Sequence, residues 1–395
     1  MTVMNSELRE KVERTNAYAC LECGKCTSIC PVSLFRRNST TDKQYSPRIL
    51  LTKAIRQKYE SLFHDYDLWS CLTCKKCDEY CPAGIHYIEL MQFLREGASR
   101  SGFDGRCSHS GALQSLSRIM TSDNLQQNRL AWLSNDLKTS KRGDVLYFVG
   151  CAPYFDVFFT DLHLSTLDAA KSSIKILNKL GISPVLLPNE RCCGHDLLWN
   201  GDVENFEKLA NQNISEIEQT GAKTILFSCA ECLSAFKKLY PEHGFSVQAE
   251  LKHMSQFLAE KLAAGELALA ASDTEVTYQD PCRLGRHLGI YDEPRQVLRS
   301  GASPQRDGDH FHDMKETGKR SLCCGVSAWM NCDLTSKTMQ VERLRQARET
   351  GAKVLAVACP KCQIHLTCAM KDQAVSEKYG IRIRDIAAIT LERME

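Results

Sequence analysis

Ten cysteines in the second part of the chain fall into two sets that share one order and nearly one spacing. In each set a lone cysteine precedes an adjacent pair followed by glycine, and a C-x2-C pair comes last. The first set is Cys151, Cys192, Cys193, Cys229 and Cys232, and the second is Cys282, Cys323, Cys324, Cys359 and Cys362. A pattern that recurs at a fixed period indicates repeated structural modules. Because thiolates are soft ligands, the two sets predict two sites for zinc or for iron–sulfur clusters.

Eight cysteines nearer the N-terminus form two runs with the spacing C-x2-C-x2-C-x3-C-P. The runs are Cys20, Cys23, Cys26 and Cys30 before Pro31, and Cys71, Cys74, Cys77 and Cys81 before Pro82. This spacing is typical of ferredoxins with two [4Fe–4S] clusters, in which the fourth cysteine of each run binds the other cluster. We therefore assign Cys20, Cys23, Cys26 and Cys81 to one cluster, and Cys71, Cys74, Cys77 and Cys30 to the other. Zinc is the alternative, but two zinc sites would not need this asymmetric spacing twice.

Short apolar segments precede the cysteine groups of both modules. They predict strands at 144–149, 184–187, 223–227, 275–278, 311–314 and 353–357, and helical periodicity predicts helices at 45–63, 88–97, 162–180, 203–217 and 230–240. Strands that alternate with helices imply a parallel sheet, and ligands bind outside the carboxyl ends of such strands. The three cysteine groups of each module should therefore converge on one metal site.

Composition limits the classes of function. The chain has 395 residues, a formal net charge of +2 and 21 cysteines. A charge this small gives no electrostatic reason to bind nucleic acid. The polar N-terminal residues do not resemble a signal peptide, and no apolar run is long enough to span a bilayer. We therefore expect a cytoplasmic protein whose cysteines are metal ligands rather than disulfides, with Cys107, Cys332 and Cys368 left over.

The motifs around these cysteines resemble a known family. Those of the modules, YFVGC, ERCCG, YQDPCRLGRHLGIYDEPRQVL, SLCCG and ACPKCQIHL, are similar to the cysteine-rich (CCG) domains of the heterodisulfide reductase B subunit. The N-terminal motifs, ECGKCTSICP, YSPRILL and DLWSCLTCKKCDEYCP, resemble the C subunit of that enzyme. A fused C–B arrangement occurs in the membrane-linked form of heterodisulfide reductase and in related iron–sulfur subunits.

The expected fold is multidomain. We predict a mainly α-helical ferredoxin domain at 1–105, a connecting segment at 106–143, and CCG domains at 144–270 and 271–395. Each CCG domain should be an α/β domain with a parallel, Rossmann-like sheet, and pseudo-twofold symmetry should relate the two. The resemblance implies that each complete five-cysteine motif holds a non-cubane [4Fe–4S] cluster.

The resemblance also implies a function. Electrons would pass through the two cubane clusters to the paired non-cubane clusters, which would reduce, or in reverse form, a disulfide. The partners would be a flavoprotein or a membrane cytochrome in a hetero-oligomer, which would place the chain in the cytoplasm or peripherally at the inner face of the membrane. The alternative is a pure electron-transfer subunit of an anaerobic dehydrogenase of the glycerol-3-phosphate or glycolate type, feeding quinone or a membrane acceptor. A further alternative has zinc in one CCG site.

Five basic residues near the CCG cysteines are further site candidates. They are His195, Arg283, Arg286, His287 and Lys361. Cationic groups at these positions would hold an anionic substrate or stabilise a leaving thiolate. The alternative is that they balance cluster charge or lie at the surface.

Overall fold

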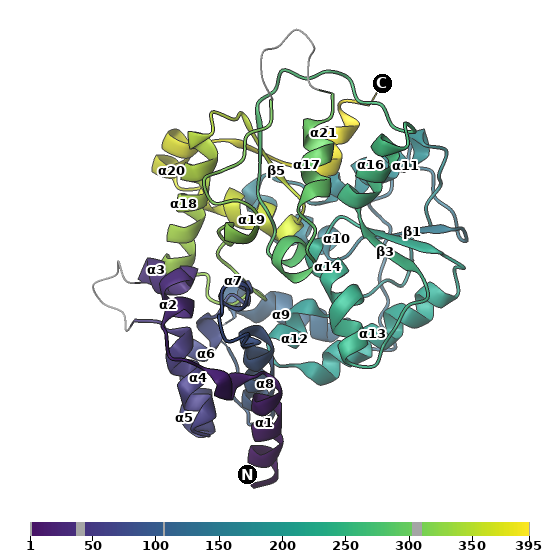
Figure 1. Ribbon diagram of the computed structural model, residues 1–395. Helices are drawn as coiled ribbons and strands as arrows, with labels where there is room; N and C mark the ends of the chain where they lie inside the picture. The colour runs from purple at the N-terminus through teal and green to yellow at the C-terminus, as the bar shows by residue number, and fades with distance from the viewer. Residues whose placement is uncertain (1, 37–43, 106, 302–309, 395) are drawn as a thin grey trace. The chain divides into compact units, whose positions relative to one another are not determined.

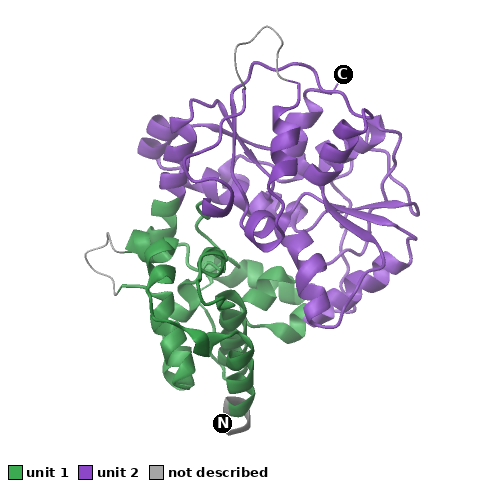
Figure 2. Cartoon of the chain, in the orientation of Figure 1, with its two compact units in different colours: residues 1–119, 194–206, 322–339 green, residues 120–193, 207–321, 340–395 purple. Residues whose placement is uncertain are grey.

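The computed structural model describes residues 2–36, 44–105, 107–301 and 310–394. The chain forms two compact units, shown in Figures 1 and 2. Unit 1 comprises 1–119, 194–206 and 322–339, and unit 2 comprises 120–193, 207–321 and 340–395. Unit 1 therefore includes the segment that follows each adjacent cysteine pair. The domains predicted from the sequence have other limits than these two units, and they stay a prediction.

Unit 1 is helical, and its described residues contain no β-strand. Its elements are α1 (Thr2–Arg14), η1 (Ala17–Ala19), α2 (Lys25–Ile29), α3 (Pro31–Arg36), α4 (Pro47–Ile55), α5 (Tyr59–Phe63), α6 (Asp67–Ser70), α7 (Lys76–Glu79), α8 (Tyr87–Arg100), η2 (Ser108–Gly111), α9 (Ala112–Ile119) and α12 (His195–Trp199). The predicted helix at 45–63 is two helices, because Gln57 between them has a positive φ of 53°. α4 begins at Pro47, whose fixed φ suits a first helical turn.

Unit 2 contains two parallel three-stranded sheets. In order across each sheet, the strands are β1 (Val145–Phe148), β2 (Thr224–Phe227) and β3 (Glu250–His253), then β4 (Val276–Tyr278), β5 (Val354–Val357) and β6 (Arg382–Asp385). Cys151 and Cys229 follow β1 and β2, while Cys282 and Cys359 follow β4 and β5. The parallel sheets and the cysteines at the carboxyl ends of these strands agree with the prediction.

Two predicted strands are shorter than expected, and two others were not predicted. The segments 184–187 and 311–314 contribute only isolated bridges, from Val185 to Ser140 and Leu146 and from Phe311 to Val276. The third strand of each sheet is β3 or β6. Both carry alternating charged residues, which is common at a sheet edge but weakens the apolar signal of a strand.

The helices of unit 2 connect these strands. They are α10 (Ala152–Phe158), η3 (Thr160–Leu162), α11 (Leu167–Lys179), α14 (Ala230–Ser234), η4 (Ala235–Leu239), α15 (Tyr240–Glu242), α16 (Met254–Ala263), η5 (Arg283–His287), α17 (Asp292–Arg299), η6 (Gly318–Arg320), α19 (Pro360–Ala369), α20 (Gln373–Tyr379) and α21 (Ile386–Leu391). Two longer helices, α13 (Val203–Glu218) and α18 (Leu334–Glu349), run from unit 1 into unit 2. In unit 2, α11 packs against α21 and α16 against α17, so helices from both CCG repeats share one core. Among the described helices, none is long and apolar enough to cross a membrane.

Candidate metal centres

Two pockets of unit 1 bring the ferredoxin-type cysteines together across the two runs. The pocket named site I is lined by Cys20, Cys23, Cys26 and Cys81, and the pocket named site II by Cys30, Cys71, Cys74 and Cys77. The fourth cysteine of each run therefore lies with the first three of the other run. Cys77 also lines site I, so it lies between the two pockets. This grouping supports the ligand assignment made from the spacing.

The two cysteine runs share one unusual backbone conformation. Glu22 and Thr73, at equivalent positions, have positive φ values of 50° and 46°. Their amides donate to the Sγ of Cys20 at 3.4 Å and of Cys71 at 3.3 Å. A non-glycine residue in this region costs about 1–2 kcal/mol. Such backbone amides stabilise negative charge on sulfur, so both loops suit an anionic cluster.

The five cysteines of the first CCG set meet in unit 2. Cys151 interacts with Cys192, Cys193 with Cys192 and Cys232, and Cys229 with Cys232. Hydrogen bonds between these neighbouring thiols, together with burial, raise the pKa of Cys151, Cys193 and Cys232 well above the ordinary thiol value. Bound metal would be needed to keep such a crowded group as thiolates. Three loops distant in sequence thus converge, as expected from the carboxyl ends of parallel strands.

A buried ion pair positions the loop that carries Cys151. Arg129 lies 2.5 Å from the Glu190 carboxylate, and both side chains are about 1% exposed. The same carboxylate accepts hydrogen bonds from the amides of Val149 at 3.0 Å and Gly150 at 2.8 Å. At Gly150 a Cβ atom would lie 3.0 Å from the Cys232 Sγ, and φ is +69°. Only glycine lets the backbone approach that sulfur without strain.

Side chains from α13 and the segment after α14 hold the adjacent pair. The Asn213 amide donates to the carbonyl of Cys192 at 3.0 Å and accepts from the Arg191 amide at 2.9 Å. The Tyr240 hydroxyl donates to the Cys193 carbonyl at 3.2 Å. The sequence analysis did not identify Asn213 or Tyr240, because neither residue belongs to a cysteine motif.

The second CCG set is divided between the two units. Cys282, Cys359 and Cys362 belong to unit 2, whereas Cys323 and Cys324 are buried in unit 1. Within unit 2, Cys359 interacts with Cys362 and also with Cys229 of the first set. The two C-x2-C pairs therefore meet directly. Each begins a helix, since Cys229 and Cys359 are the N-cap residues of α14 and α19.

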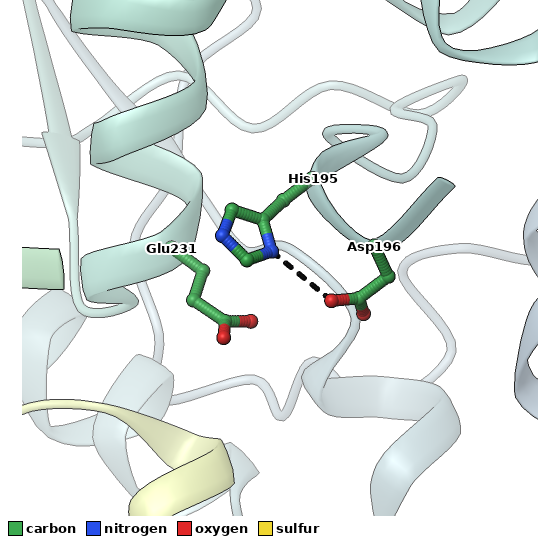
Figure 3. Close-up of side chains that lie close together, drawn as sticks. All are labelled: His195, Asp196 and Glu231. Atoms are coloured by element: carbon green, nitrogen blue, oxygen red, sulfur yellow. Dashed lines mark hydrogen bonds and ion pairs between the residues drawn. The ribbon is translucent and has the colours of Figure 1, made fainter. Parts of the chain in front are cut away.

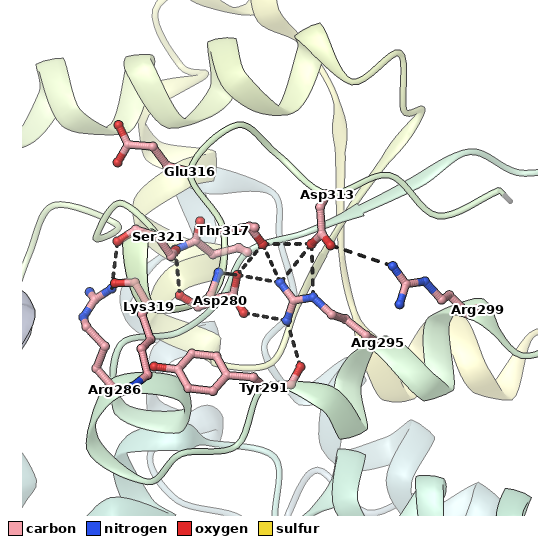
Figure 4. A network of polar contacts seen from close by, with 12 residues as sticks. Asp280, Arg286, Tyr291, Arg295, Arg299, Asp313, Glu316, Thr317, Lys319 and Ser321 are labelled. Carbon is pink, nitrogen blue, oxygen red and sulfur yellow. Dashed lines mark hydrogen bonds and ion pairs between the residues drawn. The ribbon is translucent and has the colours of Figure 1, made fainter. Parts of the chain in front are cut away.

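A polar network holds the loop that carries Cys282 (Figure 4). Asp280 accepts two hydrogen bonds from Arg295, at 2.8 and 2.9 Å. Arg295 also donates to Asp313 at 2.9 Å and to Thr317 at 2.6 Å. The network links Asp280, at the start of the cysteine loop, to the segment that leads toward residue 321. Arg295 contacts Asp280 through two parallel hydrogen bonds, a geometry that lysine could not reproduce.

The structure gives each of the five basic candidates a protein neighbour. Arg283 Nη1 lies 2.6 Å from His287 Nε2, and Arg286 donates to the Ser321 carbonyl at 2.8 Å. His195 Nδ1 lies 3.0 Å from the Asp196 carboxylate (Figure 3). All five candidates are buried, including Lys361. These residues therefore do not lie at the surface, and their direct contact with substrate stays a prediction.

Lys361 pairs with Glu231, which the sequence analysis missed. The two side chains lie 2.6 Å apart and are 5% and 12% exposed. Glu231 is the third residue of C-A-E-C and Lys361 the third residue of C-P-K-C. Opposite charges at equivalent positions of two repeated motifs were the signal that could have revealed this pair. The ion pair connects the two C-x2-C turns side by side.

We expect Glu231→Gln to destabilise the protein more than the double variant Glu231→Gln, Lys361→Met. Removing one member of a buried pair leaves an uncompensated charge, which costs about 3–5 kcal/mol, whereas removing both leaves none. Chemical unfolding of wild type, both single variants and the double variant, under anaerobic conditions, measures the coupling free energy. A coupling near zero at unchanged iron content would contradict the prediction.

The ligand candidates of the two CCG sets are all thiols. This donor set fits iron–sulfur chemistry, and zinc in one CCG site stays the alternative. The three remaining cysteines, Cys107, Cys332 and Cys368, are half-buried or exposed.

Comparisons with known proteins agree with this geometry. The family described as "Cysteine-rich domain" (CCG) matches residues 145–237 and 276–367. The family described as "4Fe-4S dicluster domain" matches residues 15–85. Each CCG match includes a complete five-cysteine set, and the dicluster match includes both ferredoxin-type runs.

Two relatives and one solved structure extend the comparison. The chain is 29% identical to a subunit of the dihydromethanophenazine:CoB--CoM heterodisulfide reductase of Methanosarcina barkeri, over 95% of this chain and 93% of that protein. It is 24% identical to "EtfAB:quinone oxidoreductase" of Syntrophomonas wolfei, over 95% of this chain and 58% of that protein. A crystal structure of a hypothetical protein from Helicobacter pylori has the same fold, with a TM-score of 0.56 at 12% identity, over 93% of this chain and 71% of that one.

The matches and the cysteine geometry lead to one assignment. Both relatives are named as oxidoreductases or as subunits of one. The chain has a 4Fe-4S dicluster domain for cubane clusters and two further cysteine-rich domains. Its role is electron transfer through iron–sulfur sites. The chain therefore joins a 4Fe-4S dicluster domain to two CCG domains, and over nearly its whole length it is similar to a heterodisulfide reductase subunit.

Proposed function

We propose that the chain reduces, or in the reverse direction forms, a disulfide at its two CCG sites with electrons that arrive through sites I and II. Cys151, Cys192, Cys193, Cys229 and Cys232 would hold one non-cubane [4Fe–4S] cluster, and Cys282, Cys323, Cys324, Cys359 and Cys362 the other. When bound, the two clusters would supply one electron each. Two electrons and two protons convert one disulfide into two thiols, so two such sites match the stoichiometry.

The observation that carries this proposal is the contact between Cys229 and Cys359. The sulfurs of a disulfide are about 2.05 Å apart, so two one-electron donors that act on one bond must lie close together. The first cysteines of the two C-x2-C pairs satisfy this requirement. The Glu231–Lys361 pair beside them keeps the two turns together.

The proposal includes a symmetric fold for the two CCG domains. Both sheets have the same strand order, and an additional bridge lies beside the first strand of each. In both, the first two strands end shortly before cysteines. A pair of Rossmann-like domains related by a pseudo-twofold axis accounts for these equivalences.

The second candidate function is electron transfer without disulfide chemistry. The similarity to an EtfAB:quinone oxidoreductase favours it, because that name describes an enzyme that passes electrons to quinone. In either function the partners we propose are a flavoprotein or a membrane cytochrome within a hetero-oligomer. The proposed location is the cytoplasm or the inner face of the membrane.

The test begins with iron, acid-labile sulfide and zinc in protein purified without oxygen. Four clusters predict about sixteen iron atoms per chain. The protein is then reduced with dithionite, freed of excess reductant, mixed with cystine, glutathione disulfide or the CoB–CoM heterodisulfide, and examined by electron paramagnetic resonance. A new signal that depends on one disulfide supports the proposal. About sixteen iron atoms without any disulfide-dependent signal would favour pure electron transfer, and stoichiometric zinc would exclude paired clusters.

A further inference from the structure

Two buried tyrosines line site II together with its four cysteines. Tyr45 is 1% exposed and Tyr87 is 4% exposed, and both side chains line the pocket that Cys30, Cys71, Cys74 and Cys77 form. Tyr45 precedes α4, and Tyr87 is the first residue of α8. The two aromatic rings therefore reach the same site from segments 42 residues apart.

Both hydroxyls lack a hydrogen bond of ordinary geometry but lie near possible acceptors. Among the described residues, neither the Tyr45 nor the Tyr87 hydroxyl makes a hydrogen bond of ordinary length and angle. The Tyr45 hydroxyl nevertheless faces the Cys71 sulfur and the Tyr87 hydroxyl. A buried hydroxyl with no partner costs about 1–3 kcal/mol, so a hydroxyl of this kind usually has an acceptor. The neighbouring acceptors are the thiolates of site II.

The Tyr45 side chain is also held in place. Ser33 donates to the Tyr45 carbonyl at 2.9 Å, and the Arg36 guanidinium lies 5.6 Å from the centre of the Tyr45 ring. Both tyrosines are buried, and a phenol keeps its O–H proton at neutral pH. A restrained neutral hydroxyl that faces sulfur can donate a hydrogen bond without losing much conformational freedom.

Site II depends more than site I on hydrogen-bond donors from the protein. Cys23 of site I is exposed, so water can donate to its sulfur. Cys71 and Cys74 of site II are each 8% exposed. Burial disfavours added negative charge, and a cluster that accepts an electron becomes more negative. Without hydrogen bonds from the protein, site II would be difficult to reduce.

We propose that Tyr45 and Tyr87 donate hydrogen bonds to the sulfurs of a [4Fe–4S] cluster in site II and thereby raise its reduction potential. The reduced cluster carries one more electron than the oxidised cluster, so these bonds are stronger in the reduced state. The two residues are positioning residues that set the redox level of one step in the electron path. The inference rests on the cubane assigned to site II and not on disulfide chemistry.

The test uses the full chain with Tyr45→Phe, Tyr87→Phe and both changes together. A potentiometric titration followed by electron paramagnetic resonance gives the reduced-to-oxidised ratio of each cluster, and Cys74→Ser identifies the signal of site II. We expect the double variant to lower that ratio for site II about tenfold at a fixed potential, which is 59 mV for one electron. Each single variant should give a smaller shift at site II. Tyr87 also lines site I, whereas Tyr45 does not, so the site I signal should stay in place in Tyr45→Phe.

Tyr59 provides a matched control. It is 2% exposed, and its hydroxyl also makes no hydrogen bond of ordinary geometry, but it lines neither site I nor site II. Tyr59→Phe should leave both potentials unchanged. An unshifted site II in the double variant at full iron content, or an equal shift in Tyr59→Phe, would overturn the proposal. A wild-type protein with no cluster in site II would overturn both the proposal and the cluster assignment. A shifted potential without any disulfide signal would leave this inference standing and reject disulfide reduction.

Discussion

Replacing Cys229 by serine is expected to lower the iron content from about sixteen to about twelve atoms per chain and to abolish any disulfide-dependent paramagnetic signal. Cys229 interacts with Cys232 of its own set and with Cys359 of the other set. A serine hydroxyl is a poor ligand for iron, so the change removes one ligand of the first cluster. Iron analysis and electron paramagnetic resonance of anaerobically purified protein measure both effects.

Cys368→Ser is the control for this experiment. Cys368 lies in α19, the helix that begins at the second C-x2-C pair, but it belongs to neither five-cysteine set. The control should keep full iron content and the disulfide signal. Normal iron and a normal signal in Cys229→Ser would show that this cysteine is not a ligand. That result would remove the observation on which the proposed function rests.

Gly201→Ala is expected to lower the free energy of unfolding by about 3 kcal/mol or more. Gly201 follows α12 with a φ of +84°, and a Cβ atom there would lie 2.3 Å from the Arg95 carbonyl oxygen. The Arg95 side chain is fully buried and donates to the carbonyls of Trp199 at 3.0 Å and Cys71 at 2.8 Å. The clash would therefore separate the segment after Cys193 from α8, within unit 1. Thermal unfolding under anaerobic conditions measures the loss.

Gly102→Ala separates the clash from the backbone strain. Gly102 follows α8 in the same unit with a φ of +81°, but an added Cβ atom would meet nothing within 4 Å. The left-handed backbone alone should cost about 1–2 kcal/mol. Equal losses of stability in the two variants would mean that the contact between Gly201 and Arg95 is unimportant. A larger loss of iron from Gly201→Ala would further indicate that this contact supports a metal site.

Much of the fold could be predicted from local patterns. The apolar segments before Cys151, Cys229, Cys282 and Cys359 are strands in the structure, because a buried parallel strand needs a short continuous apolar run. The edge strands β3 and β6 escaped prediction, since an edge strand exposes one face and carries charged residues. The segments at 184–187 and 311–314 have strand-like composition, but they form only isolated bridges.

The cysteine spacing alone predicts how the cysteines are grouped. Cysteine spacing is a local property, and the x2-x2-x3 spacing predicts cross-run sharing that places Cys81 in site I and Cys30 in site II. The recurrence of the five-cysteine order, together with strands that end at those cysteines, likewise predicts that Cys151, Cys192 and Cys229 converge. These inferences need only the chain order and the direction of parallel strands.

The groups that surround these cysteines could not be predicted from local sequence. Cys229 meets Cys359 and Glu231 pairs with Lys361, each across 130 positions of the sequence. Tyr45 and Tyr87, which are 42 positions apart, both line site II. Neither periodicity nor spacing encodes such contacts, because they depend on how separately formed elements pack. The same reason applies to two segments that belong to unit 1, namely 194–206, which follows Cys193, and 322–339, which contains Cys323 and Cys324.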